Sequence, residues 1–219
     1  MEKLITVKGV GQVTMKPDLV VLALKLETTS RDYDQCMKIA GERGDLLKNA
    51  LVKGGLPEDS LKTSDFGVNT EYRSEKNRDG NYRSIFVGWK CSHDFKVEFP
   101  LDIGRLKTVL HFISESRADC KVGVNFTLAD SGEAETALLD SAAKNARKKA
   151  ETLCSAIGVK LGSLVRIDYN WSEINIFSRT RYDSGLFASA PEAMCCSEPE
   201  IDPEDIKLND NATFVWEIA

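Results

Sequence analysis

The stretch of sequence that constrains the fold most is residues 130–169, where an amphipathic helix, a tight turn and a strand follow one another. Its apolar residues recur at spacings of three and four, which places them on one stripe of an α-helix. The stripe consists of Ala134, Leu138, Ala142, Ala146, Ala150, Cys154 and Ile157. Because most of these residues are alanines, the helix can lie close against the surface that it covers. Gly158 then predicts a helix cap, and residues 161–169 predict a strand.

Basic residues of the same helix, Lys144, Arg147, Lys148 and Lys149, lie off that stripe. The chain carries 29 Lys and Arg against 34 Asp and Glu, for a net charge of −5. We therefore interpret these residues as a solvated helix face and expect no nucleic-acid partner.

The rest of the chain alternates between strand and helix patterns. Two further helices are predicted at residues 30–53 and 101–116, and strands at 4–15, 19–28, 66–72, 85–99, 122–128 and 206–218. The strand at 19–28 is apolar on both sides in its first half, which favours a central place in a sheet. We predict a single α+β domain over residues 1–219, with one largely antiparallel sheet and three helices packed mainly on one face.

Glycines and histidines supply no clear site for chemistry. Gly9 and Gly11 predict a bulge or a close backbone approach, because the third glycine and following helix of a dinucleotide loop are missing. Cys91 and His93 share the apolar face of a strand, about 6 to 7 Å apart, and are interpreted as core residues. His111 lies in another element. We predict no catalytic, cofactor-binding or metal-binding residue, no cofactor, and a protein that is not an enzyme.

Residues 171–205 show neither the helical nor the strand period and predict a long, mobile loop, which is either a disordered connection or a candidate partner site. Of the six cysteines, only Cys195 and Cys196 lie in this loop, and the other four fall within apolar patterns. A thiol-based sensor that uses this vicinal pair is therefore one alternative function.

The sequence contains no run of about 18 apolar residues, so no membrane span is expected. Residues 1–6 lead directly into a strand pattern and show no signal-peptide core, which favours a cytoplasmic location. The location would be periplasmic, or elsewhere in the envelope, if a signal peptide had been trimmed.

Several short segments, in their order and spacing, resemble the SIMPL-domain family. They are ITVKGVG (5–11), KPD (16–18), LKT (61–63), FVG (86–88), KAETLC (149–154), IGVKLG (157–162), PEDI (203–206) and FVW (214–216). The resemblance implies an α+β fold that is widespread in bacteria, often exported, and related to a mammalian signalling protein that associates with a Pelle-like kinase. It supplies no catalytic residues.

We therefore expect a non-catalytic domain that assembles with itself or binds another protein, in a stress- or signalling-related or other pathway. A small-molecule binder or an enzyme with scattered site residues is the other alternative.

Overall fold

The structure is a computed structural model that describes residues 3–76, 82–170, 175–184 and 201–219. The chain divides into two compact units. The first, here called the three-stranded unit, comprises Met1–Asp18, Thr127–Arg179 and Pro203–Ala219, and the second, the five-stranded unit, comprises Leu19–Phe126 and Thr180–Asp202. Each unit has its own sheet and its own helical cover, so the predicted α+β class is confirmed. The expectation of one sheet is corrected to two.

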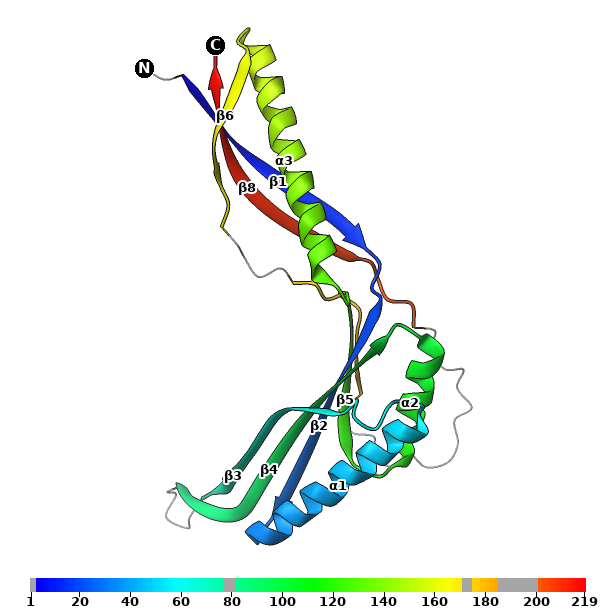
Figure 1. The fold of residues 1–219 in the computed structure, drawn as a ribbon. Helices are drawn as coiled ribbons and strands as arrows, with labels where there is room; N and C mark the ends of the chain where they lie inside the picture. Colours follow the sequence, from blue (N-terminus) through cyan, green and yellow to red (C-terminus); the bar gives the residue numbers. More distant parts are fainter. Residues whose placement is uncertain (1–2, 77–81, 171–174, 185–200) are drawn as a thin grey trace. The chain divides into compact units, whose positions relative to one another are not determined.

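The three-stranded unit contains β1 (Leu4–Met15), β8 (Ile206–Ile218) and β6 (Leu161–Asp168), in the order β1-β8-β6. Both pairings are antiparallel. Helix α3 (Ser131–Ala156) lies along β1 and β8 (Figure 1). It begins after Asp130, whose carboxylate accepts a hydrogen bond from the backbone N–H of Gly132 at 2.7 Å. It is followed by Gly158, whose φ of +73° suits glycine at a helix end.

The alanine stripe allows α3 to approach the sheet closely. The stripe residues from Ala134 to Cys154 are buried, as the sequence predicts. A Cβ atom placed on Gly9 would overlap the carbonyl oxygen of Ala142 and would lie 2.8 Å from the Cβ of Ala146. The predicted close backbone approach at Gly9 and Gly11 is therefore confirmed, because the helix backbone fills the space that a side chain would need.

The five-stranded unit has the strand order β3-β4-β2-β5-β7. The strands are β2 (Leu19–Ser30), β3 (Lys62–Lys76), β4 (Tyr82–Pro100), β5 (Cys120–Thr127) and β7 (Arg181–Ser184). Helices α1 (Tyr33–Lys53) and α2 (Ile103–Glu115) pack on its apolar face. β2 takes the middle of the sheet, as its apolar first half predicts, and Leu22, Leu24 and Leu26 are fully buried there.

Strand β7 lies inside the region 171–205 that the sequence predicts to be a loop. It pairs antiparallel with β5, from Asn125 opposite Arg181 to Val122 opposite Ser184. The interpretation of 171–205 as one uninterrupted loop is therefore wrong at residues 181–184. Residues 171–174 and 185–200 lie outside the described residues.

The hairpin of β3 and β4 extends past the end of β2. Towards the tip of the hairpin, Trp89 is the last residue of β4 that has a partner in β2, and it lies opposite Ser30. Residues 82–88 of β4 pair only with β3, at residues 71–76. We call residues 71–76 and 82–88 the aromatic arm, because Tyr72, Tyr82 and Phe86 lie on it.

Within the described ranges, no helix combines the length and the hydropathy that crossing a membrane would require.

Candidate functional site

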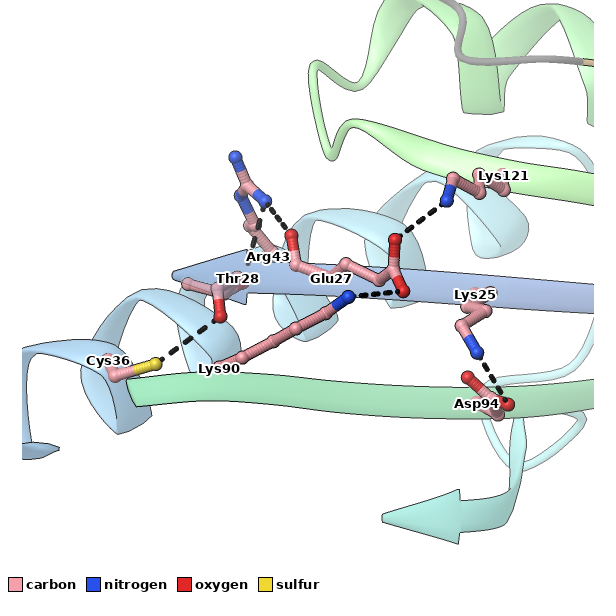
Figure 2. A network of polar contacts seen from close by, with 8 residues as sticks. All are labelled: Lys25, Glu27, Thr28, Cys36, Arg43, Lys90, Asp94 and Lys121. Carbon is pink, nitrogen blue, oxygen red and sulfur yellow. Dashed lines mark hydrogen bonds and ion pairs between the residues drawn. The ribbon is translucent and has the colours of Figure 1, made fainter. Parts of the chain in front are cut away.

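Charged side chains gather on the face of the five-stranded sheet opposite to its helices. At their centre is Glu27 of β2, whose two carboxylate oxygens bind different lysines (Figure 2). Lys90 of β4 lies 3.0 Å from Oε1, and Lys121 of β5 donates a 2.6 Å hydrogen bond to Oε2. The neighbouring pair of Lys25 and Asp94 joins β2 to β4 at 3.6 Å. The cluster therefore ties three adjacent strands together.

These contacts lower the pKa of Glu27 to about 2 from its ordinary value of 4.5, chiefly through the hydrogen bonds from Lys121 and then Lys90. A carboxylate with so low a pKa is a poor proton acceptor near neutral pH. Both of its oxygens already have partners. The arrangement thus suits the cross-linking of strands better than acid–base chemistry.

The arginine of α1 fastens the helix to the same strand. Arg43 donates from Nη1 to the carbonyl oxygen of Glu27 at 2.9 Å, and its Nη2 lies 3.4 Å from Oδ2 of Asp119 (Figure 2 shows the first contact). The thiol of Cys36 points to the carbonyl oxygen of Thr28 at 3.4 Å. Each group has a structural partner.

Cys91 and His93 do not form a nucleophile and base pair. The His93 ring lies against Phe95 and Phe66, at centroid distances of 3.8 and 4.9 Å, and its Nε2 is 3.1 Å from Oγ1 of Thr63. Burial lowers the pKa of His93, against the opposing effect of Asp94. Burial also raises the pKa of the Cys91 thiol, which disfavours the thiolate. The structure therefore agrees with the packing role predicted for both residues, although His93 is only half-buried.

The remaining histidine and the thiols lie elsewhere. His111 is exposed on α2, with Nε2 3.5 Å from Oε1 of Glu115. Cys36, Cys91, Cys120 and Cys154 are buried free thiols, and burial raises the pKa of Cys120 to about 12. Cys195 and Cys196 lie outside the described residues, so the sensor hypothesis stays a prediction. Among the described residues, no group of three or more His, Cys, Asp or Glu side chains could hold a metal ion.

A polar pocket lies in the three-stranded unit where β6 ends beside β8. It has a volume of about 600 Å³ and is lined by residues 167–170 and 210–213. Tyr169 donates a 2.7 Å hydrogen bond to the buried carboxylate of Asp210, and this bond raises the pKa of Tyr169. The second oxygen of Asp210 accepts from the N–H of Asn211. Because the carboxylate is satisfied on both sides, we interpret the pair as an anchor for the end of β6.

The aromatic arm exposes a set of rings that continues to Trp89 of β4 and Tyr33 of α1. Tyr72 and Phe86 stand opposite each other with centroids 5.7 Å apart, Phe86 lies 6.3 Å from Trp89, and Trp89 lies 5.2 Å from Tyr33. The exposed fractions are 57% for Tyr72, 72% for Tyr82, 46% for Phe86, 44% for Tyr33 and 45% for Phe66. Side chains two or four residues apart on a strand share a face, so Tyr82 lies on the same side as Phe86. An exposed apolar patch of this kind marks an interaction surface more often than an isolated ring does.

Helix α3 also covers the outer edge of β1 with hydrogen bonds. Asn145 accepts from the N–H of Val10 at 3.1 Å, and Ser141 accepts from the N–H of Gln12 at 3.2 Å. Lys149 donates to the carbonyl oxygen of Lys8 at 3.0 Å. We call Ser141, Asn145 and Lys149 the edge ladder.

The side chains of the edge ladder reach successive backbone groups of β1 because four residues of helix and two residues of strand span similar lengths. Four residues of helix rise about 6 Å, and two residues of strand rise about 6.6 Å, so each rung meets the next outward-facing backbone group. Capping these groups protects β1 from pairing with another strand. Sequence reasoning assigned Lys149 to a solvated face and missed this role, although the spacing of four between polar residues was a signal for it.

A family model described as "SIMPL: Protein of unknown function (DUF541)" matches residues 5–216, which include nearly all of both units. The chain therefore belongs to the SIMPL family. It is 26% identical over 169 residues to the "26 kDa periplasmic immunogenic protein" of Brucella melitensis biotype 1, and equally to the protein of that name in Brucella abortus strain S19. The match covers 74% of this chain and 65% of each relative. The chain thus matches just under two thirds of the length of these relatives.

The names of these relatives do not support the cytoplasmic location expected from the sequence, and they agree with its periplasmic alternative. The expectation rested on residues 1–6 of the given sequence alone, and the composition of a folded domain is similar in either compartment. The first residues of a given sequence are therefore an insufficient guide to its cellular compartment.

Proposed function

We propose that this SIMPL protein is a non-catalytic domain that assembles with itself through the aromatic arm. The observation that carries the proposal is the exposed set of rings on a two-stranded extension of the sheet. An isolated pair of strands is marginally stable in water, and its apolar face gains most from a partner that covers it. A second copy of the chain offers the same rings in a self-complementary, two-fold contact.

The exposed area is sufficient for a reversible contact. An aromatic side chain can bury roughly 150 to 250 Å². At the exposed fractions of Tyr72, Tyr82, Phe86 and the neighbouring Tyr33, the four residues leave roughly 450 Å² of surface per copy. Two copies would therefore hide roughly 900 Å², an area that is typical of weak, transient interfaces. We expect a dimer that dissociates on dilution.

The non-catalytic part of the proposal rests on the state of the groups that could do chemistry. The acid at the centre of the polar face, Glu27, is held ionised by two lysines. The half-buried imidazole of His93 has a hydroxyl partner, Thr63, and aromatic neighbours. We therefore assign Glu27 and His93 a structural role and propose that the protein acts through its exposed surfaces.

We place this activity in the periplasm. The support is the printed name of the two Brucella relatives, together with the family match over residues 5–216. In that compartment the aromatic arm would meet other envelope proteins as well as copies of this chain. A different envelope protein is therefore the second partner to test for binding to the arm.

Sedimentation equilibrium over a range of protein concentrations tests the proposal. The wild type is expected to shift from monomer to dimer with rising concentration, and a Tyr72→Ser/Phe86→Ser variant is expected to stay monomeric. Phe177→Ser is the matched control, because Phe177 is a similarly exposed ring in the three-stranded unit. A wild type that stays monomeric at 100 μM or so would contradict self-assembly, since an interface of this size should be detectable at that concentration.

A further inference from the structure

The edge ladder ends at Lys8, although β1 continues to Leu4. The rungs pair Ser141 with Gln12, Asn145 with Val10 and Lys149 with Lys8. The next residue four positions along α3 is Leu153, and the next outward-facing strand residue is Thr6. A leucine side chain cannot form a hydrogen bond. Within the described residues, no hydrogen bond occupies the outward backbone groups of Thr6.

A groove of about 600 Å³ lies at this open rung, entirely within the three-stranded unit. Its lining residues are Thr6, Val7, Lys8, Asn145, Lys148, Lys149, Thr152 and Leu153. The lining includes three lysines and no carboxylate. Elsewhere on α3, Lys144 pairs with Asp140 and Arg147 pairs with Glu151. Among the described residues, no acidic side chain forms an ion pair with the three lysines of the groove.

The groove also has an apolar part. Leu153 is 52% exposed although it lies beside the sheet, and buried Val7 contributes to the lining. The lining thus combines an exposed leucine with lysines, whereas lysines alone would offer only charge. The combination of cations, the uncapped backbone N–H of Thr6 and an apolar wall suits a ligand with an anionic head and a hydrocarbon portion.

We propose that this groove binds an anionic amphiphile, with a phosphate or carboxylate head near Lys8 and Lys148 and the hydrocarbon portion on Leu153. Lys149 keeps its bond to the carbonyl oxygen of Lys8 and contributes its charge. Binding is expected although the chain as a whole is acidic, because all of the charged side chains that line the groove are positive. The site is independent of the aromatic arm and of self-assembly.

The test is a titration of the full chain followed by amide NMR chemical shifts at residues 6–8 and 148–153. The probes are inorganic phosphate, hexyl phosphate, and sodium chloride at matched ionic strength. Hexyl phosphate is expected to bind about ten-fold or more tightly than inorganic phosphate, because each buried methylene adds about four-fold. Sodium chloride is expected to produce no saturable shifts. Equal affinity for the two phosphates, or saturable shifts with sodium chloride, would overturn the proposal.

Two variants separate the groove from the general charge of the helix. Lys148→Gln is expected to weaken hexyl phosphate binding about five-fold, the effect of one charge at about 4 Å in water. Lys144→Gln removes an equally exposed charge outside the groove and is expected to change nothing. In the Leu153→Asn variant, the asparagine side chain would form a hydrogen bond to the backbone of Thr6. Binding of hexyl phosphate should then fall at least ten-fold, although all three lysines remain. Equal effects of the two lysine variants would overturn the proposal.

Vesicles containing phosphatidylglycerol then distinguish the sources of the anionic head. Sedimentation of the protein with these vesicles, lost in Lys148→Gln, would indicate a lipid in a bilayer. Binding of hexyl phosphate without vesicle binding would indicate a free amphiphile.

Discussion

Substitution of Gly9 by alanine is expected to destabilise the three-stranded unit by about 1 to 3 kcal/mol, the usual cost of overpacking a tight contact. The added Cβ would overlap the carbonyl oxygen of Ala142 and approach the Cβ of Ala146 to 2.8 Å. Helix α3 cannot retreat without lengthening the edge-ladder bonds at Val10 and Lys8. The strain is therefore shared between packing and hydrogen bonds.

The measurement is urea denaturation followed by circular dichroism, with hydrogen exchange of the β8 amides to assign the change to this unit. Gly41→Ala is the matched control. A Cβ at Gly41 meets no atom within 4 Å, and the residue lies inside α1, so this variant should be more stable by about 0.5 to 1 kcal/mol. A Gly9→Ala variant within 0.5 kcal/mol or so of the wild type would refute the close approach of α3, since overpacking usually costs more.

Two further predictions concern titratable groups. The pKa of Glu27 is depressed, so its carboxylate stabilises the fold above pH 4.5, and this contribution is lost as the pH falls towards 2. In urea titrations, the Glu27→Gln variant should therefore lose less stability between pH 5 and 2.5 than the wild type does. An equal loss in both proteins would contradict the role of the two lysines. Native alkylation at pH 8 should spare Cys36, Cys91, Cys120 and Cys154, because they are buried, and labelling of these four at the unfolded rate would contradict the packing described here. In the same experiment, Cys195 and Cys196 should react faster than an unfolded control peptide if the thiol sensor exists.

The sequence predicted those elements whose apolar periodicity is long and regular. The helix seen at Ser131–Ala156 and the strands at Leu4–Met15 and Ile206–Ile218 agree closely with expectation, because each repeats its pattern over at least three turns or four alternating positions. Strand β7 could not be found in this way. Its four residues, Arg181–Ser184, are too few to show alternation, and it is recognised only by its pairing with β5.

The division into two sheets and the surface features depend on contacts between distant segments. Nothing in the pattern of β1 shows that it pairs with β8, at the other end of the chain, while β2 pairs with β4. In the alternating sequence, Tyr72 shares a face with Phe66 and Val68, whereas Phe86 is out of phase with the apolar positions 85, 87 and 89, so the pattern did not bring these rings together. They are exposed because residues 82–88 of β4, which precede Trp89, extend past the end of β2, and because the register shifts between Glu71 and Tyr72.

The central claim, self-assembly through the aromatic arm, is tested most directly by hydrogen exchange at two protein concentrations on either side of the dissociation constant. The account predicts that amides of residues 71–76 and 82–88 exchange more slowly in the concentrated sample, while those of the three-stranded unit do not change. A concentrated sample that is dimeric by sedimentation but shows no added protection in the arm would contradict the account, because the contact would then lie on another surface.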